Sequence, residues 1–541
     1  WLKRLELKFL LTRNWLTIGN RCHNQSMACN MKQEADACHS AARRVANLCA
    51  HTVAAESETP GRAASCCKAN GGGFATPLEA MQNGRREELL YTAVVLTKGR
   101  DGGVKQPDYL ATVDINPESP TFSTVVHRLQ MPTPGDELHH MGWNACSSCR
   151  DRPGAIMHNY LVAPGLFSGN INFIDVKTNP RAPHVHKIIT GQELGQKLGV
   201  GVPHTTHCAP NAIMVSMMGS AADAEGLFAP EGNGFAAIDP QSLEILGRWE
   251  RGDRKPASGN DFWYQPRHNV MVSTGFGHPE CFTRGFNPAH VAEGKYSRML
   301  YIWDWGTQEL VQELDCGEAS IPLEVRFLHE PSRAEGYVTC ALSGEIRRIF
   351  KKGDGAWDSE MVVKLPAVPV DGWALPEMPA LPTDIVISMD DRFLFFTNWL
   401  HGDVRMYDLS VTPEPKLVGQ VYIGGSLKKG GAVRRTDGGE QPDALKVKGI
   451  EIQGAPHMAQ LSLDGKRLYI TTSLFSTWDE QFYPEMVAKG NQMLQLDVDI
   501  HNGGLSVNDN FLVDFGTEPF GAGRANEMRL PDGDCTSDIW F

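Results

Sequence analysis

A short strand-like unit recurs through the chain from residue 89 onward, and it limits the fold more than any other feature. In each copy, successive residues alternate between the two faces of the strand, and this period of two is typical of a half-buried strand. Most copies end in an aspartate that is followed by a turn. Six copies are clear, and a degenerate seventh without the aspartate fills the long gap after the fourth. They lie at 110–114, 171–175, 235–239, 301–304, 404–408, 493–497 and, for the degenerate copy, 345–350.

A second unit precedes the first in the best-defined copies. Residues 388–396 and 462–470 each indicate a strand, a tight aspartate-containing turn and another strand, and Asp464-Gly465 is a strong hairpin signal. Two strands plus two strands make a four-stranded sheet, so seven copies predict an all-β fold, a seven-bladed β-propeller over residues 71–541. No inner strand is evident before Leu89, and we expect the segment 526–541 to supply it and close the ring. A pair of β-sandwiches is the alternative, but it would not need seven similar units.

Residues 1–70 differ from the rest and are expected to be an N-terminal extension, poorly ordered or a targeting peptide. The net charge of -13 argues against a nucleic-acid-binding surface, and no apolar run is long enough to span a bilayer. The 13 cysteines are an odd number, and most stand singly among apolar neighbours. A reducing compartment is therefore favoured, and we expect a cytoplasmic protein unless the extension directs it to an organelle.

Metal-ligand residues concentrate in two clusters, His139-His140 and His204 with His207. In a propeller, the segment leading into each innermost strand opens onto one end of the central channel. Besides these two clusters, the segments placed there by the repeat carry Trp263 and Tyr264, Glu324, Asp384, His457 and Asn526. We therefore expect the two histidine clusters to meet and to bind a transition metal, copper or zinc.

Simpler explanations exist for single histidines. A lone buried histidine usually hydrogen-bonds to a carbonyl, and this alternative applies to His457. His139 and His140 would face opposite ways on a regular strand, so both can face the channel only at a bulged strand start. His268 and His329 are expected to be structural, in turns at the opposite face. His401 is expected on the ligand face but farther from the axis, and it is kept as an outside candidate.

Cys146 and Cys149 form a CxxC pair within eleven residues of His139. Such a pair is a redox dithiol, half of a zinc site or two incidental thiols. The sequence has no second CxxC to complete a four-cysteine zinc site, so the three interpretations remain open.

The chain from about residue 76 to residue 540 resembles the selenium-binding protein family, whose members include methanethiol oxidases. The resemblance is carried by the stretches 107–114, 136–149, 261–271, 391–394 and 461–473. It implies a β-propeller with a copper centre that oxidises methanethiol with oxygen and water to formaldehyde, hydrogen sulfide and hydrogen peroxide. It also implies that the copper histidines are His139, His140 and one or both of His204 and His207.

The chain departs from the family pattern at two places. Asn526 stands where the family commonly has histidine, and His457 stands where many members have glutamine, so we hypothesise that His457 replaces the missing ligand. Ser123 aligns with the cysteine proposed to carry selenium in animal members, and a hydroxyl cannot hold selenium as a selenosulfide. Of the family's N-terminal cysteine pair, Cys67 is retained and Asn70 occupies the partner position.

Blade position suggests roles for four further residues. Glu324 or Asp384 would act as a general base, and Trp263 or Tyr264 would wall the pocket for a methyl group. The expected partners are a small thiol and oxygen. The alternative function is a propeller that carries selenium or binds other proteins through its faces without catalysis. A hydrolase such as a lactonase would prefer a hard ion and oxygen ligands, which the histidine clusters argue against.

Overall fold

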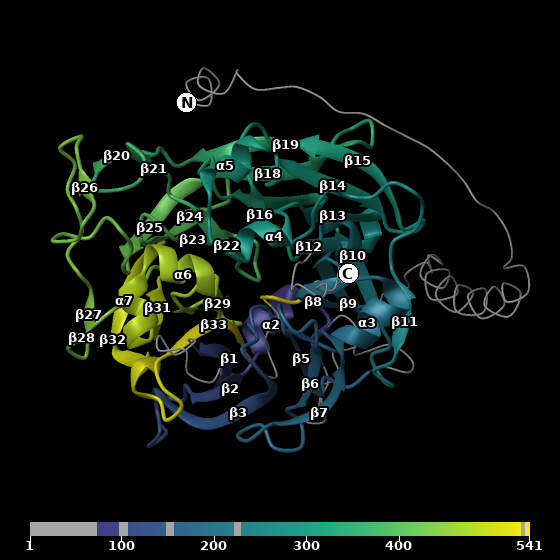
Figure 1. The fold of residues 1–541 in the computed structure, drawn as a ribbon, viewed down its shortest axis with the longest axis horizontal. Coiled ribbons are helices and arrows are strands. Elements are labelled where there is room, and N and C mark those ends of the chain that lie inside the picture. The colour runs from purple at the N-terminus through teal and green to yellow at the C-terminus, as the bar shows by residue number, and fades with distance from the viewer. Residues whose placement is uncertain (1–72, 97–105, 148–155, 221–228, 532–535) are drawn as a thin grey trace, which may run out of the picture.

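The sheets of the protein surround a common centre and give it a propeller-like, all-β architecture (Figure 1). The computed structural model describes residues 73–96, 106–147, 156–220, 229–531 and 536–541. Within these residues seven sheets have four antiparallel strands each. Six of the seven sheets use strands that are consecutive in the chain, as the repeat predicts.

The strands of these sheets are short, and the third strand ends close to the predicted aspartate in every sheet except the one that contains β18, whose copy of the repeat has no aspartate. The six consecutive sheets comprise β4 (Gly142–Trp143), β5 (Tyr160–Pro164), β6 (Ile171–Asp175) and β7 (His184–Ile189); β8 (Gly201–Ala209), β9 (Ala212–Gly219), β10 (Gly234–Ile238) and β11 (Ile245–Arg248); β12 (Phe262–Gln265), β13 (Val270–Thr274), β14 (Met299–Asp304) and β15 (Glu309–Asp315); β16 (Pro322–Phe327), β17 (Glu335–Cys340), β18 (Glu345–Lys351) and β19 (Trp357–Lys364); β22 (Pro382–Ile387), β23 (Phe393–Asn398), β24 (Asp403–Asp408) and β25 (Lys416–Tyr422); β29 (Ala459–Leu461), β30 (Arg467–Ile470), β31 (Gln492–Val498) and β32 (Leu505–Asp514).

The seventh sheet joins the two ends of the described chain. Its strands are β1 (Leu89–Leu96), β2 (Pro107–Asp114), β3 (Thr124–Pro134) and β33 (Gly523–Arg529), and β33 pairs antiparallel with β1. A C-terminal segment therefore supplies the missing strand, as expected, but it is 523–529 rather than 526–541. Pro531 follows this strand and cannot donate a ladder hydrogen bond, which accounts for its early end. Further along, Trp540 packs against Ala80 and Leu463 instead.

In all seven sheets the repeated unit is the third strand when the strands are counted across the sheet from β4, β8, β12, β16, β22, β29 or β33. This includes the degenerate copy, which forms β18. The aspartate recurs because its carboxylate organises the turn that follows. Asp175 accepts the backbone N–H groups of the residues two and three positions later, and Asp239 does the same. Asp304 accepts from Thr307 N at 2.8 Å. These turns are the local signal that made the repeat visible in the sequence.

The core lies between neighbouring sheets, which are apolar on both faces. Phe395 and Val404 of one sheet, for example, belong to the same buried cluster as Leu468 and Leu494 of the next. The first strands of neighbouring sheets also contact one another, as β4 contacts β8 and β16 contacts both β12 and β22. The starts of these strands are thereby gathered around the centre.

Short helices and small sheets decorate this framework, and none of the described helices is long and apolar enough to cross a membrane. Helix α6 (Ser476–Phe482) contacts helix α7 (Pro484–Lys489) and lies left of the centre in Figure 1. The remaining α-helices and strands are α2 (Pro77–Asn83), α3 (Gly191–Leu198), α4 (Pro279–Phe282), α5 (Pro288–Ala292), β20 (Val368–Asp371), β21 (Glu377–Met378), β26 (Arg434–Arg435), β27 (Lys446–Val447) and β28 (Ile450–Glu451).

The joining strand should be important for stability. Met528 of β33 is 1% exposed, whereas Met361 of β19 is 49% exposed. We expect Met528→Ala to lower the free energy of unfolding by about 2 kcal/mol or more, because it leaves a cavity in the core. Met361→Ala, the matched control, should change it by less than about 0.5 kcal/mol. Urea unfolding of both variants measures this, and equal effects would contradict the packing described for β33.

Candidate metal centre

The segments that lead into three inner strands carry the candidate ligands. His139 and His140 lie just before β4, His204 lies in the first half of β8, and His457 lies two residues before β29. Because β4 contacts β8, the chain segments that carry the two histidine clusters of the sequence are brought together. The convergence comes from the arrangement of the sheets, since these residues are far apart in the chain.

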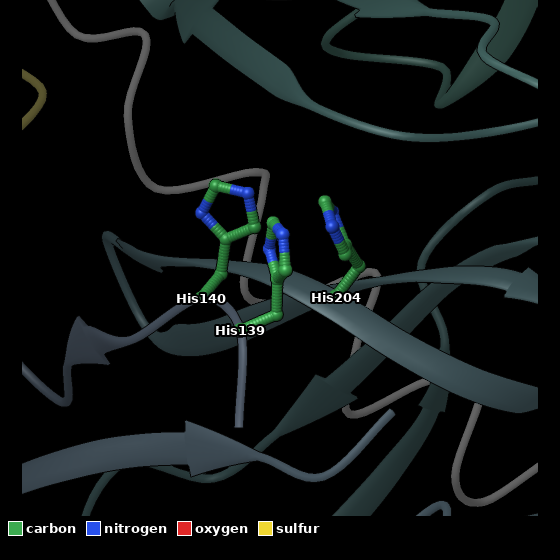
Figure 2. Close-up of side chains that lie close together, drawn as sticks. All are labelled: His139, His140 and His204. Atoms are coloured by element: carbon green, nitrogen blue, oxygen red, sulfur yellow. The ribbon is translucent and has the colours of Figure 1, made fainter. Parts of the chain in front are cut away.

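Three imidazoles form a compact, buried group (Figure 2). His139, His140 and His204 each offer a ring nitrogen, and these atoms lie within 4.8 Å of one another. The ring centroids of His140 and His204 are 4.2 Å apart, and those of His139 and His204 are 4.9 Å apart. All three side chains are shielded from solvent.

Each of these rings is held through one nitrogen. His139 Nε2 lies 3.0 Å from the carbonyl oxygen of Leu474, and His140 Nδ1 lies 3.0 Å from Glu527 Oε2. His204 Nδ1 lies 3.3 Å from the hydroxyl of Thr205. The anchors leave the second nitrogen of each ring available.

The second nitrogens are the ones without a partner: among the described residues, His139 Nδ1, His140 Nε2 and His204 Nε2 have no hydrogen bond. Two imidazole nitrogens that share an ion at about 2.1 Å lie at most roughly 4.2 Å apart, so nitrogens separated by the full 4.8 Å would have to close by roughly 0.6 Å. That is a small adjustment for side chains. The group can therefore hold a metal ion, and unpartnered buried imidazole nitrogens are what such an ion requires.

The environment also sets the protonation state that a ligand needs. Burial lowers the pKa of His139 and of His204 well below the ordinary value, and the neighbouring imidazoles lower both further. Burial acts in the same way on His457, with His140 as the second cause. A metal binds the neutral imidazole, so it does not have to displace protons from these rings near neutral pH.

His457 lies at the edge of the group. Its ring centroid is 5.7 Å from that of His139, and neither of its ring nitrogens has a hydrogen-bond partner among the described residues. The residue is positioned through its backbone, since its N–H donates to Thr471 O. Asn526 borders the same group, because its Nδ2 donates to the Leu474 carbonyl that also contacts His139.

His207, the other histidine of the second cluster, lies apart from the three-histidine group. Its Nε2 is 3.9 Å from Asp261 Oδ1, and its ring packs edge-on against Phe262 and Trp263 at 5.1 and 5.0 Å. Side chains three positions apart on a strand point to opposite faces, which separates His207 from His204. Of the two histidines in the second cluster, His204 therefore belongs to the compact group and His207 does not.

Charged groups continue the polar lining beyond the histidines. Glu324 Oε1 lies 3.6 Å from His140 Nε2, and Arg326 reaches Asp261 at 2.6 Å, Glu324 at 3.3 Å and Asp384 at 3.7 Å. Burial raises the pKa of Glu324 well above its usual value, and the charge of Asp261 adds to this. Burial alone would also raise the pKa of Asp261, but Arg326 and His207 lower it overall.

The two predicted general bases thus differ. Asp384 accepts the backbone N–H groups of Ile385 and Ala459, each at 2.7 Å, so both of its oxygens hold backbone in place. Burial raises the pKa of Asp384 as well. Of these two predicted bases, Glu324 is the one that lies near a candidate ligand, His140.

The aromatic side chain next to the three histidines was not found from the sequence. Phe475 stacks on His139 with ring centroids 4.4 Å apart and lies 6.3 Å from His204. Of the predicted pocket residues, Trp263 instead lies beside His207 and under the Arg326 guanidinium, and Tyr264 stacks on Trp305 at 4.4 Å. Phe475 lies shortly after the β29–β30 hairpin, and His457 lies shortly before it. The two ends of a hairpin lie close together, so this placement is the sequence signal that could have identified Phe475.

Several other predicted residues have ordinary structural environments. His329 Nε2 lies 3.0 Å from Ile387 O, as expected for a structural histidine, and His401 Nε2 lies 3.1 Å from Met378 O. The Ser123 hydroxyl donates to Leu512 O at 2.6 Å. Cys146 is buried and contacts Ile539 O, while Cys149 and Cys67 lie outside the described residues, so the redox pair stays a prediction.

The fold and the site together define a propeller-like, all-β protein with a buried three-histidine group that can hold a metal ion. The sequence profile of the 56 kDa selenium-binding protein family matches residues 67–541, and the chain belongs to that family.

Relatives within the family carry two kinds of name. A methanethiol oxidase of Mus musculus is 51% identical over 486 residues, covering 88% of this chain and 100% of the relative. Selenium-binding protein 2 of Mus musculus is 50% identical over the same shares of the two chains. The solved structure of a hypothetical selenium-binding protein from Sulfolobus tokodaii is 35% identical, has a TM-score of 0.75, and covers 86% of this chain and 98% of its own.

The buried imidazoles predict how stability depends on pH in the metal-free protein. Their pKa values are lowered on folding, so the unfolded chain takes up protons near pH 6.5 that the folded chain does not. The free energy of unfolding should therefore be retained above that pH and fall below it. In His457→Gln, the loss between pH 7.5 and 5.5 should shrink by about 1.4 kcal/mol. Urea unfolding at the two pH values tests this, and an unchanged loss would contradict it.

Proposed function

We propose that the protein is a copper-dependent methanethiol oxidase that converts methanethiol, oxygen and water to formaldehyde, hydrogen sulfide and hydrogen peroxide. The observation that carries the proposal is the buried group of His139, His140 and His204, with one unpartnered nitrogen on each ring. The substrate and the reaction come from the relatives named methanethiol oxidase, which this chain matches over 88% of its length.

The architecture that we propose for this enzyme is a seven-bladed β-propeller formed by residues 71–541, with residues 1–70 as an extension. Each four-stranded sheet would be a blade, and the pairing of β33 with β1 would close the ring. The five described cysteines form no disulfide among themselves, which supports a reducing, cytoplasmic location.

The proposed ligands are His139, His140, His204 and, as a fourth imidazole, His457. Copper would supply one-electron redox chemistry and an affinity for the soft sulfur of a thiol. Zinc suits the same imidazoles but is redox-inactive, so it does not account for the transfer of electrons to oxygen. His207, the remaining predicted ligand, would lie outside this set and would contact Asp261.

The chain's own groups would bind the thiol and manage its protons. Phe475 stacks on His139 and packs against Phe276 and Phe282, so these rings would form an apolar wall for the methyl group and keep water out. We assign the proton-transfer role to Glu324, because its Oε1 lies 3.6 Å from His140 Nε2. Burial raises the pKa of Glu324, which favours the protonated carboxyl group and suits a residue that donates a proton before it accepts one. Asp384 would position the backbone of the strand after His457.

The alternative is a protein that carries selenium or binds other proteins through the propeller faces without catalysis. The name of the relative selenium-binding protein 2 favours it. Ser123, whose hydroxyl is engaged with Leu512, offers no thiol at the position where the family is proposed to carry selenium. This alternative predicts no peroxide from methanethiol.

Activity and metal content should fall together when a ligand is removed. We expect purified protein to contain copper and to release peroxide and sulfide from methanethiol. His204→Ala should lose at least about 100-fold in activity together with most of its copper. His401→Ala, which removes a buried histidine whose Nε2 lies 3.1 Å from the Met378 carbonyl oxygen, is the control and should keep both. Copper-loaded protein without peroxide formation would refute the oxidase.

The role of His457 has its own test. If His457 supplies the ligand that Asn526 does not, His457→Ala should lower copper occupancy, measured by elemental analysis after dialysis against a chelator. The double variant His457→Gln with Asn526→His, which exchanges the two side chains towards the common family pattern, should restore it. Unchanged occupancy in His457→Ala would reject the idea.

A further inference from the structure

Strand β33 carries a buried carboxylate, Glu527, that the proposed ligand set does not use. Glu527 is 4% exposed. Its Oε2 lies 3.0 Å from His140 Nδ1 and also accepts the backbone N–H of Met141, while its Oε1 contacts the Arg529 guanidinium. Donors therefore approach both oxygens, which suits an ionised carboxylate because that group can only accept.

This contact determines which nitrogen of His140 faces the other histidines. An acceptor oxygen at Nδ1 requires the proton to be on Nδ1, so the lone pair of the neutral ring is on Nε2. Nε2 is the atom that has no hydrogen-bond partner among the described residues. His139 is held by the Leu474 carbonyl and His204 by a hydroxyl, so His140 is the ring of the three that is held by a carboxylate.

We propose that Glu527 is a positioning residue of the metal site: it fixes the tautomer and orientation of His140, and so makes metal affinity depend on the strand that joins the two ends of the chain. The inference rests on the proposed ligand role of His140. A carboxylate that accepts from a ligand histidine raises the basicity of the other nitrogen and limits rotation of the ring.

The position of Glu527 in the fold gives the contact a second consequence. Glu527 belongs to the sheet that contains β1, whereas His140 leads into β4 of the next sheet, so the contact crosses between two sheets. An ion that binds the folded protein stabilises the contacts on which its binding depends. Metal binding should therefore hold β33 in place, and correct seating of β33 should favour metal binding.

The competing explanation is that Glu527 only neutralises the buried charge of Arg529. Glu335 provides a matched control, because it is also buried, lies 3.0 Å from Arg348 and accepts from Tyr337, but sits in β17. Glu527→Gln and Glu335→Gln are compared in the full chain. Dissociation constants for Cu⁺ and for Zn²⁺ are measured by competition with a chelator, and urea midpoints are measured without metal. Zinc is included because its binding requires no redox chemistry.

We expect Glu527→Gln to weaken binding of both ions by about 10- to 100-fold and Glu335→Gln to leave it within about twofold, even though both variants lower the metal-free midpoint. Glu527→Asp keeps a charge for Arg529 but withdraws the carboxylate from His140, so it should fold and still bind more weakly than the wild type. Wild-type affinity in both Glu527 variants would overturn the positioning role and leave the oxidase proposal intact. If the wild type binds neither ion, the metal site and this inference are both wrong.

Discussion

The burial of neutral imidazoles where the inner strands begin is the constraint on which the rest of the account depends. A buried nitrogen without a hydrogen bond costs about 1–3 kcal/mol. His139, His140 and His204 each carry one such atom, and His457 carries two. In the folded protein these nitrogens without hydrogen bonds belong to neighbouring side chains, and an ion bound among them would satisfy several of them at once. This is the physical reason to regard the cluster as a binding site rather than as part of an ordinary core.

The surrounding structure can bear that cost because its core is closely packed and because the anchors come from different parts of the framework. Leu474 follows β30, Thr205 lies in β8 and Glu527 lies in β33, so each ring is fixed by a separate part of the framework. The apolar packing between neighbouring sheets supplies the stability. Phe475 then covers His139, which keeps the site away from water.

The parts of the fold that were predictable are those with a local chemical cause. The repeated strand was visible because aspartate is needed to accept backbone N–H groups in the following turn, as Asp175 and Asp239 do. The approximate place of the joining strand followed from the missing inner strand of the first sheet. Its limits did not, because residues 536–541 lie outside this strand, with Trp540 packed against Ala80 and Leu463.

The candidate site was predictable by residue type but not by geometry. Histidines stand out in any sequence, whereas the choice of His204 over His207 depends on the direction of each side chain and on an irregular register between β8 and β9. Phe475 and Glu527 were missed because an apolar ring and a carboxylate are common residues. They acquire a role only from what the folded chain places beside them, His139 in one case and His140 in the other.

X-ray absorption at the copper edge of the purified, copper-loaded protein tests the central claim most directly. The account predicts three or four nitrogen scatterers at about 2.0 Å with the outer-shell pattern of imidazole, and one fewer in His140→Ala. A first shell dominated by sulfur at about 2.3 Å would place copper on cysteines and would contradict the three-histidine centre.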